Sequence, residues 1–139
     1  MNAVAGACLE VDVGSELDVR QVIAGVTHFC AAQQLPGLFA AHVATAASEL
    51  ANNLWMHTAC GGRVRLQLLQ GARGPGVELV AEDQGPAIAD VERALAEGFS
   101  TAGGLGCGLP GVQRLMDEFA IDTQPGRGTC VTARKWVRR

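Results

Sequence analysis

The sequence contains no tyrosine, and aromatic residues make up only 4% of it. Proteins that bind single-stranded nucleic acid by base stacking need aromatic platforms, so this scarcity argues against that function. The formal net charge of −3 also indicates no broad basic surface for a nucleic acid. Basic residues do gather near the C-terminus, at Arg134, Lys135, Arg138 and Arg139. We interpret them as a solvated tail that keeps an edge strand soluble, in preference to a binding patch.

Disulfide and metal-binding patterns are also missing. The five cysteines lie far apart without a CxxC pair, and the three histidines form no HExxH motif. These spacings argue against a disulfide framework or a zinc site and predict a reducing compartment. The N-terminus lacks a signal-peptide pattern, and no apolar run is long enough to cross a bilayer. We therefore expect a cytoplasmic protein without a membrane partner.

The two familiar nucleotide-binding loops are absent, because the chain has neither GxxxxGK[ST] nor a strand–GxGxxG–helix opening. Instead, residues 100–111 form a glycine-rich stretch. A helix is predicted directly after it, since Pro110 suits a first turn and apolar residues follow at helical spacing, namely Val112, Leu115, Met116 and Phe119. A glycine-rich loop that runs into a helix N-terminus exposes backbone N–H groups, and this arrangement binds phosphate.

The rest of the chain predicts the order β-α-α-β-β-α-α-β-β. Strands are expected over 7–13, 63–70, 77–83, 119–123 and 129–137, and a six-residue turn over 71–76. Helices are expected from a capping box at Ser15–Asp18 to about Gln34, over about 38–57, and around Ile88, Val91 and Leu95. Tight turns between strands imply an α+β two-layer sandwich, with a mixed, largely antiparallel sheet covered on one face by helices. The length predicts a single domain over 1–139.

Two motifs carry polar side chains suited to chemistry. Glu49 and Asn53 are one turn apart on the helix over 38–57. The predicted core stripe of this helix is Val43, Ala47, Leu50 and Leu54. Glu49 and Asn53 lie opposite the stripe, so both are expected to project out of the core. Taken alone, the ordinary explanation of such a pair is that it belongs to the solvated surface. Asp83 and Gly85 end an apolar strand, where a carboxylate could accept a hydrogen bond from an adenine amino group. Taken alone, an ordinary Asp-x-Gly-Pro turn is the better explanation of this motif.

Two glycine motifs complete the set. Gly104, Gly106 and Gly108 alternate along the loop before the last helix. Ordering so many glycines costs conformational entropy, so their density suggests a functional reason. Gly128 and Thr129 open the final strand, where a hairpin turn is the ordinary explanation.

In this order, the four motifs together resemble the ATP-binding site of the GHKL (Bergerat-fold) superfamily of gyrase, Hsp90, histidine kinases and MutL. Longer strings are similar to the RsbT-type serine/threonine switch kinases of bacterial stress-response partner switching. These strings are AEDQGP at 81–86, GFST at 98–101 and GGLGCGLPGVQRLMDEF at 103–119. The resemblance covers nearly the whole chain. One departure is Ala87, where that family usually has glycine.

The resemblance implies ATP- and Mg²⁺-dependent phosphorylation of serine or threonine on STAS-domain antagonist proteins, together with binding of a downstream phosphatase or other effector. It implies that Glu49 is catalytic, orienting or deprotonating the acceptor hydroxyl, and that Asn53 is the metal ligand. It places contacts to the nucleotide at Asn53, Asp83, Gly85, Ala87, Ser100, Thr101, Gly104, Leu105, Gly106, Gly108, Leu109 and Thr129.

The alternative function is a non-catalytic, ATP-dependent module that captures a sigma factor or another effector. Glu49 favours catalysis, because a pure nucleotide binder needs Asn53 more than Glu49. We interpret Arg114 as a solvated helix residue in preference to a phosphate ligand. We interpret Cys107 as a small residue tolerated in the loop, in preference to a redox-sensitive thiol. Residues 98–108 are predicted to form a short lid that is mobile without nucleotide and orders over ATP.

Overall fold

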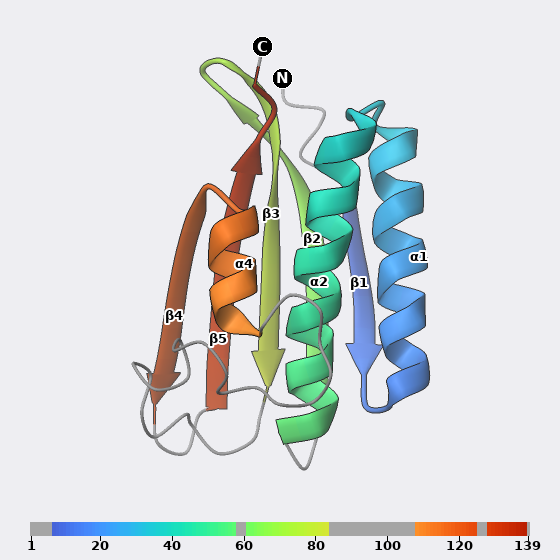
Figure 1. The fold of residues 1–139 in the computed structure, drawn as a ribbon, viewed down its shortest axis with the longest axis vertical. Helices are drawn as coiled ribbons and strands as arrows, with labels where there is room; N and C mark the ends of the chain where they lie inside the picture. Colours follow the sequence, from blue (N-terminus) through green and yellow to red (C-terminus); the bar gives the residue numbers. More distant parts are fainter. Residues whose placement is uncertain (1–6, 58–60, 84–107, 125–127, 139) are drawn as a thin grey trace.

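The computed structural model of the chain describes residues 7–57, 61–83, 108–124 and 128–138. In this part of the chain the elements follow one another as drawn in Figure 1. They are β1 (Cys8–Val13), α1 (Glu16–Ala32), α2 (Gly37–His57), β2 (Gly62–Gly71), β3 (Gly74–Asp83), α4 (Leu109–Leu115), β4 (Glu118–Gln124) and β5 (Gly128–Trp136).

The strands form one five-stranded sheet in the order β1-β2-β3-β5-β4. The helices lie together on one face of it (Figure 1). The predicted α+β two-layer sandwich is therefore confirmed. Every neighbouring pair of the described strands is antiparallel, which confirms the largely antiparallel sheet. The sheet was predicted to be mixed, but the described strands contain no parallel pair.

The core lies between the sheet and the helices α1 and α2. The predicted stripe of α2 is buried throughout, and α1 buries residues at helical spacing, Val19, Val22, Val26, Phe29 and Cys30. On the sheet, Val77, Leu79 and Ala81 of β3 alternate toward this core. Amphipathic spacing in the sequence thus corresponds to burial in the fold. No helix of the described residues is both long and apolar enough to cross a membrane.

The start of α1 differs from the predicted capping box. Ser15 is the N-cap residue, but its side chain makes no capping hydrogen bond. Asp18 instead accepts a hydrogen bond on Oδ2 from the backbone N–H of Gly14, at 2.8 Å. Aspartate is one methylene shorter than the glutamate of the usual box, and here it binds the amide of the residue before the cap.

The β2–β3 hairpin is tighter than predicted. Gly71 pairs directly with Gly74, so the turn contains only Ala72 and Arg73 instead of residues 71–76. Its glycines belong to the strands for a packing reason. A Cβ at Gly76 would lie 2.4 Å from Cε3 of Trp136, so the strand needs glycine where this indole ring crosses it.

The helix after the glycine-rich stretch is shorter than its apolar spacing predicts. It ends at Leu115, Met116 has an extended backbone, and Phe119 lies in β4. The backbone N–H of Asp117 donates to the carbonyl of Arg134 at 2.8 Å, which draws the chain into the sheet. Phe119 therefore fits a helical spacing by coincidence, while the predicted strand that it opens is confirmed.

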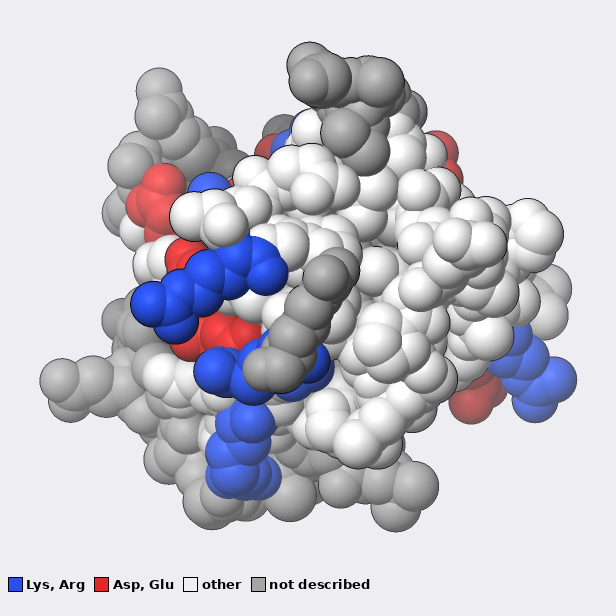
Figure 2. Space-filling model, turned by 90° about the horizontal axis from the view of Figure 1, so that it is seen from above, with Lys and Arg blue, Asp and Glu red and all other residues white. Residues whose placement is uncertain are grey.

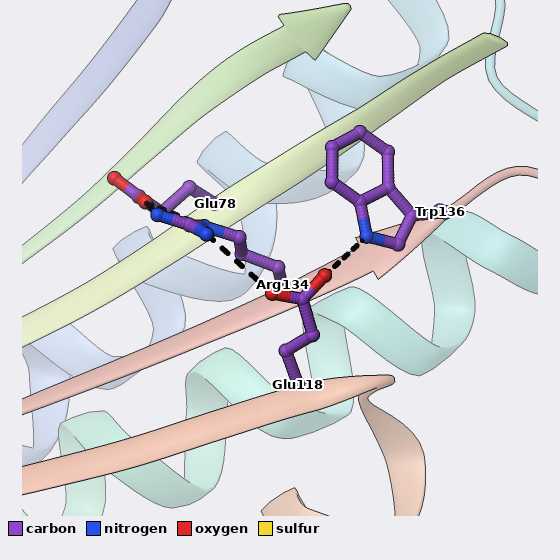
Figure 3. Close-up of polar contacts among 4 residues, drawn as sticks. All are labelled: Glu78, Glu118, Arg134 and Trp136. Atoms are coloured by element: carbon purple, nitrogen blue, oxygen red, sulfur yellow. Dashed lines mark hydrogen bonds and ion pairs between the residues drawn. The ribbon is translucent and has the colours of Figure 1, made fainter. Parts of the chain in front are cut away.

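The predicted solvated tail beside an edge strand is wrong for Arg134 and Lys135, which lie in β5, because β5 lies between β3 and β4 and not at an edge. Arg138 follows β5 and is exposed, and Arg139 lies outside the described residues. Arg134 forms ion pairs with Glu78 at 2.8 Å and Glu118 at 3.4 Å, and Trp136 Nε1 donates to Glu118 Oε2 at 2.6 Å (Figure 3). Figure 2 shows this end of the molecule, with basic and acidic side chains side by side.

Candidate functional site

The predicted site residues that the structure describes lie toward the end of the sheet where β3 finishes and β5 begins. Gly62 pairs with Asp83 in this part of the sheet. A Cβ at Gly62 would lie only 2.8 Å from Cδ2 of Leu54, so the second half of α2 packs closely on it. Asn53 precedes Leu54 on the same helix, and α4 begins beside α2 (Figure 1).

Glu49 is buried, with 5% of its surface exposed, whereas it was expected to project out of the core. Its Oε1 accepts a hydrogen bond from the backbone N–H of Gly108 at 3.1 Å. The expectation failed because a helical wheel reveals one apolar stripe and cannot show that the start of α4 covers the adjoining face. Burying a carboxylate without hydrogen bonds costs free energy. The hydrogen bond from Gly108 offsets part of this cost and also orients the Glu49 side chain.

Gly108 places its amide toward Glu49 by an unusual backbone conformation. It is the N-cap of α4, with φ 69° and ψ −140°, a region that glycine adopts readily and other residues do not. Its carbonyl accepts from the amides of Gly111 and Val112 at 3.0 and 3.2 Å, which begins the helix. Pro110 lies in the first turn as predicted, and Leu109 is buried.

Asn53 is half-buried and follows Glu49 by one helical turn. Its neighbour Asn52 has a structural role, since its Oδ1 accepts a hydrogen bond from Trp55 Nε1 at 3.0 Å. The carboxamide oxygen of Asn53 is a hard oxygen ligand of the kind that Mg²⁺ accepts. The pair thus offers one carboxylate and one amide from the same side of α2.

Asp83 is buried at the last position of β3, with 8% exposed. Gly128 approaches it across the sheet with φ +83°, and a Cβ there would lie 2.2 Å from the Asp83 carbonyl oxygen and 2.9 Å from its Oδ1. Only glycine allows this approach. Next to it, the buried hydroxyl of Thr129 lies 3.1 Å from that of Thr123.

The pairing of β3 with β5 therefore joins two motifs that are far apart in the sequence. Two contributors were not predicted as site residues: Gly128, which backs Asp83, and Thr123, which orients the Thr129 hydroxyl. The glycine was visible in its motif, but Thr123 depends on the register of β4 against β5, which no local pattern contains.

Seven predicted site residues lie outside the described residues: Gly85, Ala87, Ser100, Thr101, Gly104, Leu105 and Gly106. The same is true of the predicted helix around Ile88, Val91 and Leu95, of Cys107, and of all of the predicted lid except Gly108. Arg114 is exposed on α4, as expected of a solvated residue.

The described residues fit a nucleotide. Asp83 is a buried carboxylate beside Gly128, and the amide side chain of Asn53 and the carboxylate of Glu49 lie on α2. Asp83 suits a hydrogen-bonding base, and the oxygen of Asn53 suits a cation that prefers oxygen ligands.

Comparison with known proteins agrees with this geometry. Residues 15–135 match the histidine kinase-like ATPase domain family. The chain is 46% identical to the serine/threonine-protein kinase RsbT of Bacillus subtilis over 98 residues, which cover 70% of this chain and 73% of that protein. It is 28% identical to the anti-sigma F factor of a Thermoanaerobacter species over 100 residues, 70% of each chain.

A solved structure shares the fold. It is that of the SiaB–SiaC complex from Pseudomonas aeruginosa, which matches with a TM-score of 0.54 and covers 92% of this chain and 88% of the matched chain. The sequence identity is 16%, so this likeness concerns the fold alone.

Proposed function

The chain belongs to the histidine kinase-like ATPase domain family, and we propose that it is a serine/threonine-protein kinase of a bacterial partner-switching pathway. Its substrate would be a STAS-domain antagonist protein, and it would also bind a downstream phosphatase or other effector. The observation that carries the proposal is Glu49, a carboxylate kept buried beside the predicted phosphate loop. A module that only binds nucleotide needs Asn53 more than it needs this carboxylate.

Glu49 would act on the acceptor hydroxyl. Phosphoryl transfer depends mainly on positioning and charge stabilisation, so the base must be held in one orientation. The hydrogen bond from the Gly108 amide supports this role, because it joins Glu49 to the start of the helix that follows the glycine-rich stretch. Glu49 would then orient the hydroxyl for attack and receive its proton.

Asp83 and Asn53 would bind opposite ends of the nucleotide. The buried carboxylate of Asp83 would accept a hydrogen bond from the adenine amino group, with Gly128 leaving room beside it. The amide oxygen of Asn53 would hold Mg²⁺, which neutralises phosphate charge when bound. The remaining nucleotide contacts would come from the other predicted residues, including Leu109 and Thr129.

The decisive experiment incubates the purified chain with labelled ATP, Mg²⁺ and a STAS-domain protein encoded in the same genome. Wild type should transfer label to the STAS-domain protein. Glu49→Gln should reduce the transfer rate by about 100-fold or more, because the base is lost. ATP affinity should change little, since glutamine still accepts the hydrogen bond from Gly108. Asn53→Ala should weaken ATP binding in Mg²⁺.

Glu10→Gln is the matched control, because Glu10 is exposed on the edge strand β1, away from the junction of β3 and β5. It should transfer label at the wild-type rate. No labelling by wild type would refute the kinase proposal, and nucleotide-dependent binding of a partner without labelling would support the non-catalytic alternative. Wild-type transfer by Glu49→Gln would refute the role of Glu49.

A further inference from the structure

A groove lies at the end of the molecule opposite the candidate site. It has a volume of about 600 Å³ and is lined by residues 71–74 of the β2–β3 hairpin and residues 136–138 at the end of β5. Strand β3 runs from this groove to Asp83 over ten residues, a path of about 30 Å at the usual rise of a strand. The groove is thus separate from the nucleotide end.

Glycines and hydrogen bonds hold the groove in shape. Cβ atoms at Gly71 and Gly76 would lie 2.7 and 2.4 Å from the ring of Trp136, so the indole rests on backbone that carries no side chains. Trp136 Nε1 donates to Glu118, and the backbone N–H of Val137 donates to the carbonyl of Pro75 at 2.9 Å. The walls of the groove are therefore already ordered, so binding a ligand there would cost little conformational entropy.

Both charged residues that line the groove are arginines. Arg73 stands in the hairpin turn and is exposed, and Arg138 follows β5 with its side chain 80% exposed, paired with Asp117 at 2.8 Å. Among the described residues that line the groove, none is acidic. Figure 2 views the molecule from this end and shows basic and acidic side chains side by side on it. Arginine binds carboxylates through two parallel hydrogen bonds, and tryptophan and arginine are the side chains enriched at binding hot spots.

We propose that this groove docks an acidic segment of a partner protein, with apolar side chains against Trp136 and carboxylates on Arg73 and Arg138. The charge of the walls selects the acidic segment, and the indole selects its apolar residues. A nucleic acid is disfavoured because only two cations, Arg73 and Arg138, line the groove, whereas nucleic-acid binding depends on many phosphate contacts. The inference goes beyond the proposed kinase activity, since docking here leaves the nucleotide end open.

The test uses a fluorescein-labelled octapeptide that alternates glutamate with leucine, and fluorescence anisotropy with the full chain. Saturable binding is expected, and Arg73→Glu should weaken it about tenfold or more. Arg20→Glu is the matched control, because Arg20 is an exposed arginine on α1; its binding should equal wild type. The same peptide with lysine for glutamate should not bind. A Trp55→Phe variant leaves Trp136 as the only tryptophan, and its emission should change on binding.

Several results would overturn the proposal: no saturable binding of the acidic peptide, equal weakening by Arg73→Glu and Arg20→Glu, or unchanged Trp136 emission at saturation. Tighter binding of a single-stranded DNA octamer that competes with the peptide would also overturn it, in favour of nucleic acid. The measurement needs no nucleotide, so its failure leaves the kinase proposal standing. Failure of the labelling experiment likewise leaves the peptide result interpretable.

Discussion

At the scale of single residues, the chain's only lysine has a specific structural partner. Lys135 Nζ donates to the carbonyl of Leu115 at 2.8 Å, where α4 ends, and lies 6.0 Å from the ring centroid of Phe39. Carbonyls at a helix C-terminus lack partners within the helix, so a cation there satisfies one of them and favours the dipole. Lys135 thus holds the far end of the helix whose first residues meet Glu49.

Lys135→Met should lower the free energy of unfolding by about 1–2 kcal/mol, because methionine keeps the length of the side chain but has no donor. Urea denaturation measures this loss. Amide hydrogen exchange should also speed up in α4 relative to α1. Lys135→Arg is the control, and it should recover most of the stability because it keeps a charged donor. A methionine variant as stable as wild type would show that the hydrogen bond contributes nothing net.

The sequence predicted which residues belong to the candidate site wherever a motif contains them. It did not predict the burial of these residues or their neighbours in the fold. The spacing of Glu49 and Asn53 indicates a shared side of α2, which the structure has. The burial of Glu49 depends on α4, whose contact with α2 joins residues 59 positions apart. The role of Gly128 against Asp83 also depends on a long-range contact, so neither could be derived from neighbours in the sequence.

At the scale of elements, the junction of β3 and β5 depends on a single glycine. Gly128→Ala would force a side chain into left-handed backbone and against the Asp83 carbonyl. We expect a loss of about 1–3 kcal/mol in the free energy of unfolding and weaker ATP binding, because Asp83 must move. Thermal unfolding and titration with ATP in Mg²⁺ measure the two effects.

Gly37→Ala provides the comparison for this variant. Gly37 begins α2, and a Cβ there would meet nothing within 4 Å. Alanine at this position should be neutral or stabilise the protein by up to about 1 kcal/mol, with ATP binding unchanged. If both substitutions had the same effect, the close approach of Gly128 to Asp83 would not be responsible.

Periodicity predicts most elements because it records which face of a segment is buried. The positions of α1, α2, β1 and β5 follow from it to within a few residues. Errors arise where a tertiary partner determines the outcome. Glycines 71, 74 and 76 suggest a long turn, but they lie in the paired strands, and the ring of Trp136 occupies the space beside Gly71 and Gly76. Helix α4 ends before Phe119 because the chain there joins β5.

At the scale of the whole molecule, Asp117 links the start of β4 to the end of β5. Its Oδ2 accepts from the Trp136 amide and its Oδ1 from the Arg138 guanidinium, both at 2.8 Å. Burial by itself raises the pKa of Asp117, but these hydrogen bonds and the charge of Arg138 lower it, and the net shift is downward. The ionised carboxylate therefore stabilises the folded state.

This stabilisation is present above the pKa of an unfolded aspartate, about 4, and is lost as pH falls through the lower folded value. Wild type should be more stable than Asp117→Asn at pH 7, and the difference should shrink below about pH 4. Chemical denaturation at several pH values measures it. A difference that stays constant from neutral to strongly acidic pH would exclude the ionised form as its source.

The tight turns of the chain predict an antiparallel sheet, but they do not reveal the order of its strands. Strand β5 comes last among the described strands and carries four of the chain's basic residues nearby, which suggested an edge. It lies inside because β4 pairs on its outer side. Strand order is a property of the whole molecule, since it depends on which distant segments bury each other's faces.

The order β1-β2-β3-β5-β4 also has a kinetic consequence. Strands β2 and β3 meet through a two-residue turn, whereas Asp83 and Gly128 must close a long loop before they touch. Loop closure costs entropy that only later contacts recover, so distant pairings form late in folding. The hairpin end of the sheet is then an early-forming part of the molecule, and the nucleotide end is among the last. If Asp83 binds adenine as proposed, a partly folded chain cannot yet do so, and we expect ATP binding to appear only with the finished fold.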